Sequence, residues 1–277
     1  MDQFAVIGYG AITDEMVQCL AGRGELHSLL GVLVRAQRVA EARDKAAGRF
    51  AVLDSLEALL DLGPDVVAEC AGHGAMREYG PAILAKGVDV LCSSVGVLAD
   101  RAFEAQIGRA SREGGARLWI PSGAVAGIDG LLAARTAGLR EVTYTSIKPP
   151  LAWDGTPAQA LLAGAARERR TAFFEGSARE AATRYPQNAN VGATVSLAGL
   201  GLDRTQVKLV SDPAASGPLG IIEAEGQFGS FRFEILAYAS PRNPKTSLLT
   251  AHSMLVALSE GVCFSAGPGS GDRKRTR

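Results

Sequence analysis

The chain has 277 residues, and its 29 basic and 29 acidic side chains leave a formal net charge of zero. Nucleic-acid-binding domains usually carry a basic face, so this balance argues against that class of protein. No apolar run reaches the roughly 18 residues of a membrane-spanning helix, and we expect neither a nucleic-acid nor a membrane partner.

Short apolar runs alternate with amphipathic ones over the first 121 residues. Strands are predicted at Phe4–Ile7, Leu29–Val34, Asp65–Glu69, Val88–Cys92 and Arg117–Ile120. Helices are predicted between them, at about Ile12–Ala21, Ala36–Ala47, Ala75–Ala85 and Asp100–Glu113. Strands that alternate with helices form parallel sheets with right-handed crossovers, which predicts a Rossmann-type α/β domain.

The pattern changes after residue 122. Strands are predicted at Val142–Ile147, Thr171–Phe174, Val207–Val210, Gly220–Glu225 and Phe231–Ala237. Helical spacing covers Asn190–Leu200, and a last helix is predicted from about Pro244 to Leu258. Strands that follow one another directly indicate an antiparallel sheet, here in a second, smaller α+β domain.

The predicted domains are therefore discontinuous. A dinucleotide-binding domain covers residues 1–123 and is completed by the C-terminal helix at 243–260. A domain for substrate binding and dimerisation covers 124–242. The Gly-rich and basic segment 266–277 is predicted to be a disordered tail, which is the usual interpretation of such a composition at a chain end.

A glycine-rich turn follows the first strand. Gly8-Tyr9-Gly10-Ala11-Ile12-Thr13 nearly matches G-x-G-x-x-G, with Thr13 in the third glycine place. In this motif the first glycine allows a tight turn, and the second lets a pyrophosphate approach the backbone at a helix N-terminus. We therefore expect Gly8, Gly10, Ala11 and Ile12 to bind NAD or NADP; the alternative is an ordinary strand–helix turn.

The second strand ends at a basic residue. An acidic residue usually holds the ribose hydroxyls of NAD at this place, but here it is Arg35, with Arg38 one turn later. Either arginine could bind the 2′-phosphate of NADP, or both could be a solvated helix start. The choice between NAD and NADP stays open.

Three later loops are small and glycine-rich. They are Cys70–Gly74, Ser93–Gly96 and Pro121–Ala124. Ligands of open parallel sheets bind beyond the carboxyl ends of the strands, so a cofactor would lie across these loops.

These residues, taken with the second half of the chain, resemble the L-aspartate dehydrogenase family. The matching stretches are Gly8-Tyr9-Gly10-Ala11-Ile12, Glu69-Cys70-Ala71-Gly72-His73, Ser94-Val95-Gly96, Ser122-Gly123-Ala124, Tyr185-Pro186-Gln187-Asn188-Ala189-Asn190-Val191 and Asn243-Pro244-Lys245-Thr246-Ser247. The resemblance implies NAD(P)-dependent oxidation of L-aspartate to iminosuccinate, which hydrolyses to oxaloacetate and ammonia. It also implies a homodimer, and cofactor contacts at Ala124 and Asn190.

One position departs from the family pattern. The family carries an Asp-Pro pair, then six residues, then a catalytic His; here the pair is Asp212-Pro213, the spacing is kept, and the place of the His holds Gly220. A general acid or base typically raises the reaction rate by 10²–10⁴-fold, so the absence of the family histidine is expected to lower the activity. The possible substitutes are His73, which follows a strand, and Lys148, since a desolvated lysine can act as a base.

Other candidates for the missing group are weaker. His27 precedes the second strand, His252 lies on the last helix, and Lys245 belongs to the predicted substrate site. His27 is expected at the surface, and His252 is expected to be a packed or surface residue of its helix.

Two predicted helix starts could bind substrate carboxylates. Asn243-Pro244 fits an N-cap followed by proline, with Lys245, Thr246 and Ser247 in the first turn, and Asn188 precedes the other helix. Free N–H groups and the helix dipole would favour an anion such as L-aspartate or a similar dicarboxylate. The alternative is plain helix capping.

The four cysteines and three histidines show no metal-ligand spacing, and no metal site is predicted. Free thiols and the lack of a leader pattern at residue 1 suit the cytoplasm. Three functions remain open: an aspartate dehydrogenase, a dehydrogenase for another small substrate, and a nicotinamide-nucleotide-binding protein without catalysis.

Overall fold

The computed structural model describes residues 2–186, 189–240 and 243–265, with the backbone alone for 239–240 and 243–246. The chain forms two compact units. Unit 1 comprises Met1–Ser94, Arg101–Gly123 and Thr250–Arg277, and unit 2 comprises Val95–Asp100 and Ala124–Leu249. Each unit is therefore built from separated stretches of sequence.

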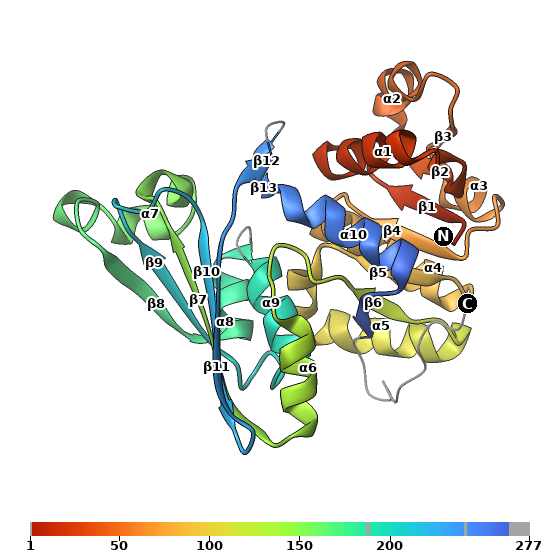
Figure 1. Cartoon of the computed structure of the whole chain (residues 1–277). Coiled ribbons are helices and arrows are strands. Elements are labelled where there is room, and N and C mark those ends of the chain that lie inside the picture. Colours follow the sequence, from red (N-terminus) through yellow and green to blue (C-terminus); the bar gives the residue numbers. More distant parts are fainter. Residues whose placement is uncertain (1, 187–188, 241–242, 266–277) are drawn as a thin grey trace. The chain divides into compact units, whose positions relative to one another are not determined.

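Unit 1 contains a seven-stranded sheet (Figure 1). Its order is β14-β6-β5-β4-β1-β2-β3, with β1 at Phe4–Ile7, β2 at Leu29–Leu33, β3 at Ala51–Leu53, β4 at Val66–Glu69, β5 at Asp89–Cys92, β6 at Leu118–Ile120 and β14 at Phe264–Ser265. The strand pairs from β6 to β3 are parallel, and β14 adds antiparallel to β6. The predicted Rossmann-type sheet is confirmed, and its carboxyl ends provide the loops that follow.

Helices cover both faces of this sheet (Figure 1). They are α1 (Ala11–Arg23), α2 (Val39–Ala46), α3 (Leu56–Leu60), α4 (His73–Ala85), α5 (Arg101–Gly114) and α10 (Leu248–Glu260). Phe4 and Val6 of β1 belong to one core with Met16 of α1 and Met254 and Leu255 of α10, all of them almost fully buried. Burial of such side chains contributes roughly 1.5–3 kcal/mol each, so α10 is an integral part of unit 1.

Unit 2 contains a five-stranded sheet of order β11-β10-β7-β9-β8. The strands are β7 (Leu139–Lys148), β8 (Thr171–Ser177), β9 (Gln206–Ser211), β10 (Leu219–Gly226) and β11 (Gly229–Leu236). The pairs are antiparallel except β7 with β9, which are parallel. The expected antiparallel sheet is confirmed with that one exception.

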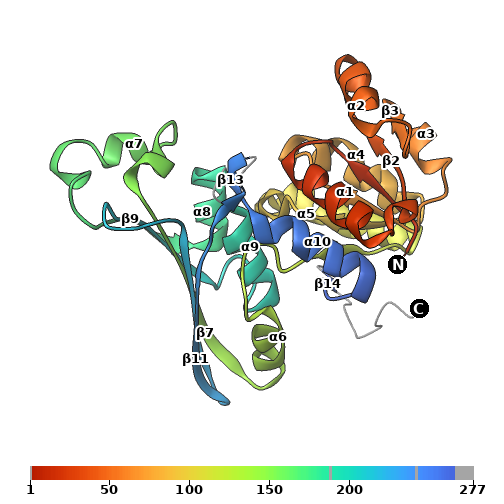
Figure 2. The ribbon, with the colours of Figure 1, turned by 45° about the horizontal axis from the view of Figure 1, so that its top comes forward.

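Three helices of unit 2 lie on one face of its sheet, as Figure 2 shows. They are α6 (Ile128–Thr136), α8 (Ala178–Arg184) and α9 (Ala189–Ala198); a shorter helix, α7, covers Ala158–Leu161. A Cβ atom built at Gly192 of α9 would lie 3.5 Å from the ring of Tyr144 on β7, so this helix packs closely against the sheet. A two-stranded ribbon of β12 (Ala239–Ser240) and β13 (Asn243–Ser247) completes the unit.

Two sequence predictions were wrong in this fold. The last helix begins at Leu248, not near Pro244, because Asn243–Ser247 pairs with β12 as a strand. Strand β3 and helix α3 were not predicted, since a three-residue strand and a five-residue helix are too short to show a periodicity. Among the described residues, the structure has no helix of the length and apolarity needed to cross a membrane.

Candidate functional site

The turn between β1 and α1 depends on Gly8. Its φ of +93° is one that side-chain-bearing residues rarely adopt, and a Cβ there would lie 2.8 Å from the Cβ of Ala71. The close approach to the loop after β4 therefore requires glycine at this position.

Gly10 differs from Gly8: it is the N-cap residue of α1 and has extended backbone geometry, with φ −102° and ψ −161°, that any residue can adopt. A Cβ atom at this position would meet no protein atom within 4 Å. No steric need within the protein explains the glycine, whereas a ligand lying on the turn would. The N–H groups of the first turn of α1 and its dipole favour an anionic ligand, so the turn fits a dinucleotide pyrophosphate.

Thr13 does more than fill the third glycine place. Its side chain is fully buried, and its hydroxyl donates a 2.8 Å hydrogen bond to the carbonyl oxygen of Gly8. The threonine thus holds the turn in place from inside the helix. This hydrogen bond was not predicted from the motif, in which Thr13 only takes the third glycine place.

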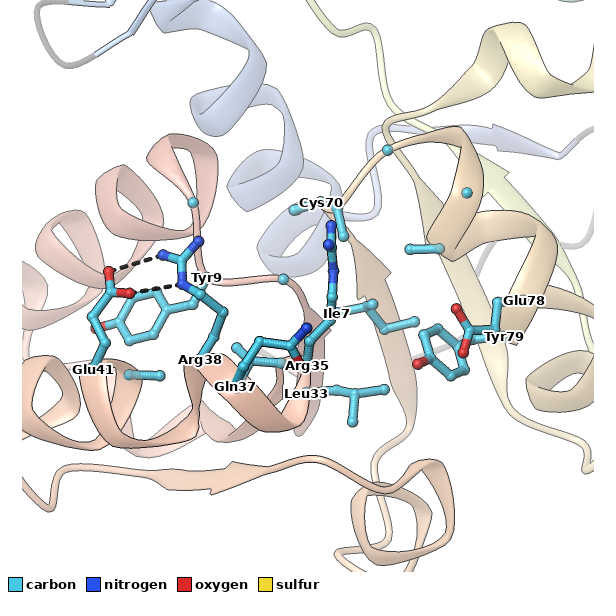
Figure 3. Close-up of a pocket in the computed structure, with 18 of the residues that line it drawn as sticks. Ile7, Tyr9, Leu33, Arg35, Gln37, Arg38, Glu41, Cys70, Glu78 and Tyr79 are labelled. Carbon is cyan, nitrogen blue, oxygen red and sulfur yellow. Dashed lines mark hydrogen bonds and ion pairs between the residues drawn. The ribbon is translucent and has the colours of Figure 1, made fainter.

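The turn opens into a cleft of about 830 Å³ in unit 1 (Figure 3). Gly8, Gly10, Arg35 and His73 all line it, which brings together four residues predicted from sequence. Figure 3 shows the Arg35 side chain standing in the middle of the cleft, between Ile7 and Gln37.

The two arginines after β2 differ in their surroundings. Arg38 forms an exposed ion pair with Glu41, at 2.7 Å between Nε and Oε2. Arg35 is exposed on the cleft wall. The pKa of Tyr79 is raised, mainly by its hydrogen bond to Glu78, and the positive charge of Arg35 opposes this rise. Of the two, Arg35 is better placed to receive a phosphate.

A buried carboxylate organises the loops after β4 and β5. Glu69 has no exposed surface, and its Oε1 accepts hydrogen bonds from the backbone N–H groups of Ala71 and Gly72, both at 2.7 Å. Its carboxylate also accepts from the backbone N–H and the hydroxyl of Ser94, each at 3.1 Å. Burial raises the pKa of Glu69, and these hydrogen bonds oppose the rise. One side chain therefore fixes two of the three predicted cofactor loops.

The role of Glu69 as a loop organiser was not predicted from the sequence, in which it is a strand residue and part of a stretch that resembles the family. An acid at the end of an apolar strand, directly before the Gly-rich loop Cys70–Gly74, was the available signal. Burial also raises the pKa values of the Cys70 and Cys92 thiols, so neither is an activated nucleophile.

In unit 2, Asn190 on α9 binds the segment that follows β5. Its Oδ1 accepts a 3.0 Å hydrogen bond from the N–H of Gly96. Arg179, which the sequence analysis missed, donates to the carbonyl oxygens of Leu98 at 3.3 Å and Ala99 at 2.7 Å. The segment 95–100 is thereby anchored within unit 2, and Ala124 begins the second stretch of that unit.

Gly220 lies on β10, opposite Ser146 of β7. A Cβ atom at this position would come within 3.3 Å of the hydroxyl of Tyr144 and 3.5 Å of Ile235. Burial raises the pKa of Tyr144 to about 12, so the phenol stays protonated at neutral pH. Tyr144 therefore borders the space in which a side chain at position 220 would start.

Lys148 occupies the same face of the sheet as Ser146, since residues two apart on a strand point to the same side. It is diagonal to Gly220, a relation that places residues about 7–8 Å apart. Its ammonium lies 5.2 Å from the ring centre of Trp153, and burial lowers its pKa to about 8.

The remaining predicted residues are distributed as follows. Asn188 lies outside the described residues, as do the side chains of Lys245 and Thr246, whose backbone belongs to β13. Because Asn243-Pro244 does not begin a helix, the argument from an N-cap and a helix dipole at that place is wrong. The Oγ of Ser247 is buried and has no hydrogen-bond partner among the described residues. His27 is exposed, and His252 lies on α10 next to α1.

Comparison with known proteins agrees with this architecture. Residues 8–121 match a family model described as the NAD-binding domain of homoserine dehydrogenase, and 129–261 match the C-terminal domain of aspartate dehydrogenase. An L-aspartate dehydrogenase of Polaromonas sp. is 42% identical over 93% of this chain and 97% of its own length. The enzyme of that name from Ruegeria pomeroyi is 43% identical over 92% and 91%.

The fold has a matching solved structure. Aspartate dehydrogenase from Thermotoga maritima superposes with a TM-score of 0.72 at 26% identity, over 94% of this chain and 96% of the other. With an NAD(P)-binding domain, a glycine turn that fits the pyrophosphate and relatives of this identity over nearly the whole length, the chain belongs to the L-aspartate dehydrogenase family of oxidoreductases.

Proposed function

We propose that this protein oxidises L-aspartate to iminosuccinate with NAD or NADP. The observation that carries the proposal is the match to L-aspartate dehydrogenases over nearly the whole chain. It is supported by the glycine turn, where a Cβ atom at Gly10 would meet no protein atom within 4 Å and a ligand therefore has room. When bound, the nicotinamide would accept a hydride from the carbon that bears the amino group. The residues of the chain must bind the dicarboxylate and move the proton.

On the cofactor side, the proposal uses Gly8, Gly10, Ala11 and Ile12 for the pyrophosphate and Arg35 for the adenosine ribose or its 2′-phosphate. Ala124 and Asn190 are proposed near the nicotinamide half. Glu69 acts indirectly, by fixing the loops over which the dinucleotide would lie.

On the substrate side, Asn188, Lys245, Thr246 and Ser247 stay predictions for the carboxylates. Ser247 has the best physical support, because a buried hydroxyl without a partner among the described residues costs about 1–3 kcal/mol unless a ligand or water satisfies it. A homodimer also stays a prediction, which light scattering of the purified protein tests.

For proton transfer we propose Lys148 in place of the histidine that Gly220 replaces. A pKa of about 8 leaves roughly one amine in ten unprotonated at pH 7, enough for a base that takes the proton of the substrate ammonium. His73, which lines the cofactor cleft, is the alternative.

The test is aspartate-dependent formation of NADH or NADPH across a pH series. The activity should rise as the pH passes about 8, where Lys148 loses its proton, and Lys148→Met should lower kcat/KM by about 10²–10⁴-fold and remove this step. Lys208→Met is the matched control, since Lys208 lies on β9 in an exposed ion pair with Glu175. An unchanged pH profile in Lys148→Met would exclude Lys148, and His73→Ala would then be measured.

Gly220 also favours a second candidate, a nicotinamide-nucleotide-binding homologue that does not turn over substrate. Binding of NADH or NADPH without turnover of aspartate or other small amino and hydroxy acids would select it. A dehydrogenase for another small substrate is distinguished by turnover of one of those acids instead.

A further inference from the structure

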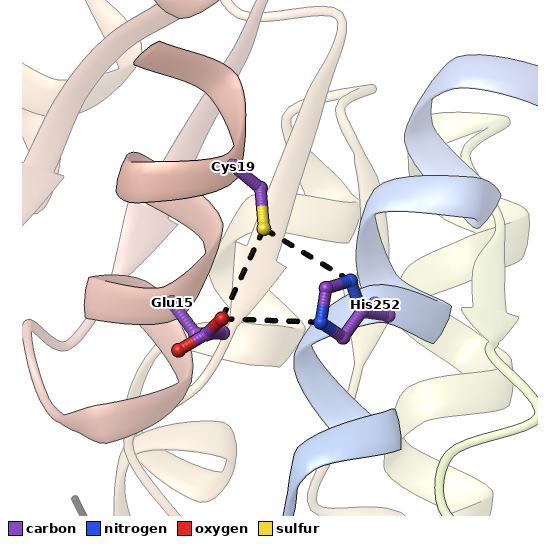
Figure 4. A group of neighbouring side chains, drawn as sticks. All are labelled: Glu15, Cys19 and His252. Carbon is purple, nitrogen blue, oxygen red and sulfur yellow. Dashed lines mark hydrogen bonds and ion pairs between the residues drawn. The ribbon is translucent and has the colours of Figure 1, made fainter. Parts of the chain in front are cut away.

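Three side chains with metal-binding atoms meet on unit 1, outside the cofactor cleft (Figure 4). Glu15 and Cys19 belong to α1, and His252 belongs to α10. A carboxylate oxygen, the thiol sulfur and an imidazole nitrogen lie within 4.8 Å of one another. We propose that this group, the α1–α10 cluster, binds one zinc-type divalent cation.

The two helices present these residues in a fixed arrangement. Glu15 and Cys19 are four residues apart and so project from one side of α1. Directly beneath them, Met16 and Leu20 of α1 share a core with Ala251 and Leu255 of α10. Because this apolar contact holds the helices together, the backbone positions of the three residues are set before any ion binds.

The distances are close to those of a coordinated ion. Cys19 Sγ lies 4.0 Å from Glu15 Oε1 and 4.0 Å from His252 Nδ1, whereas the other ring nitrogen of His252, Nε2, is the one that lies 3.9 Å from Glu15 Oε1. Because one ion binds one imidazole nitrogen, the separation that applies to the whole set is the limit of 4.8 Å between one ligand atom of each residue. Tetrahedral zinc with these ligand types separates them by about 3.4–3.6 Å, which follows from bonds of about 2.0–2.3 Å. Side-chain rotation can close the difference, because Glu15 and His252 are partly exposed, at 20% and 39%.

The set of donor atoms selects the metal. A thiolate with an imidazole and a carboxylate suits zinc and its neighbours, whereas calcium and magnesium prefer oxygen ligands alone. Three protein ligands and partial exposure leave a fourth position for water. The bound ion would tie α10, which comes from the far end of the sequence, to the helix whose N-terminus we assign to the dinucleotide.

The test uses the full, untagged chain with Co²⁺ as a spectroscopic probe and Zn²⁺ in competition with a chromophoric chelator. We expect one ion per chain and a thiolate-to-cobalt charge-transfer band. Cys19→Ser should abolish the band, and His252→Ala and Glu15→Gln should weaken Zn²⁺ binding at least about tenfold, since even residues that only orient a ligand contribute 10–100-fold.

Cys263→Ser and His27→Ala are the matched controls, because they remove a partly buried thiol and an exposed imidazole outside the cluster. Both should bind like the unaltered chain. A missing band in the unaltered chain, or a band that survives in Cys19→Ser, would overturn the proposal. Unchanged far-ultraviolet circular dichroism and NADH binding of each variant separate loss of the ion from loss of the fold or of the proposed function.

Discussion

The cofactor side of unit 1 and the sheet of unit 2 are built under different constraints. In unit 1 the turn is specified by backbone geometry, through the positive φ of Gly8, the open space at Gly10 and the buried bond of Thr13. In unit 2 the proton transfer that we propose depends on a single side chain, Lys148 of β7, which is diagonal to Gly220 of β10. A backbone-specified site leaves little freedom to vary, while a side chain can be lost without harm to the strand that carries it.

The largest effect should come from restoring a proton carrier in unit 2. In the Lys148→Met background, Gly220→His should raise aspartate-dependent reduction of NAD(P) by about 10²–10⁴-fold if the rest of the site is intact. Because the new Cβ lies 3.3 Å from the Tyr144 hydroxyl, we expect the double variant with Tyr144→Phe to gain at least as much. The measurement is steady-state kinetics; no gain in either variant would show that position 220 is not where the proton is transferred.

The next effect compares the two glycines of unit 1. Gly10→Ala should weaken NADH binding by about 100-fold while leaving the thermal midpoint unchanged, because its Cβ meets ligand space alone. Gly8→Ala should weaken binding and also lower stability by about 1–3 kcal/mol, through its φ of +93° and its contact with Ala71. Fluorescence titration and thermal unfolding distinguish them, and equal NADH affinity in Gly10→Ala would contradict the phosphate turn.

A smaller effect is expected from the buried carboxylate. Glu69→Gln can keep one oxygen for the N–H groups of Ala71 and Gly72, but its NH₂ then faces the backbone N–H of Ser94, which loses its acceptor. This should cost about 2 kcal/mol and lower the melting temperature by roughly 4–8 °C. Ser94→Ala, which loses only one of the bonds, is the graded control and should cost about 1 kcal/mol. A Gln variant as stable as the unaltered chain would refute the organising role of Glu69.

The smallest effect should distinguish the two arginines after β2. Arg35→Ala should weaken NADPH binding about tenfold relative to NADH, since a partly exposed charge contributes about 1.4 kcal/mol to a phosphate contact. Arg38→Ala, whose guanidinium is already paired with Glu41, should change the ratio less. Calorimetric titration with NADPH and with NADH measures the ratio of the two affinities. An unaltered affinity ratio in Arg35→Ala would remove the basis for a preference for NADP.

The sequence predicted unit 1 well because its signals are local. β1, α1 and the turn between them follow from adjacent residues, and so do β4, β5 and β6. It failed at Asn243–Ser247, where asparagine and proline suggested a helix start but pairing with Ala239–Ser240 produced a strand. The two segments are close in sequence, but strands of two and five residues are too short to show an alternation, and their pairing has no signature in a short window of sequence.

The contacts of the candidate sites were only partly predictable for the same reason. Gly8 and Gly10 belong to the glycine motif and Arg35 was predicted from its place at the end of the second strand; all three line the cleft. The bonds of Glu69 to Ser94, and the approach of Tyr144 to Gly220, join residues that lie 25 and 76 positions apart, and only the folded chain reveals them.

Unit 1 is built from three separate stretches of sequence, and this affects how it folds during synthesis. The face of β1 that packs on Met254 and Leu255 of α10 emerges from the ribosome long before that helix does. After Gly123, where the N-terminal stretches of unit 1 end, residues 124–249 must be translated before the last stretch of the unit begins, which takes roughly 6–25 s at usual elongation rates. During this interval the nascent N-terminal half presents an apolar surface that other chains or chaperones can contact.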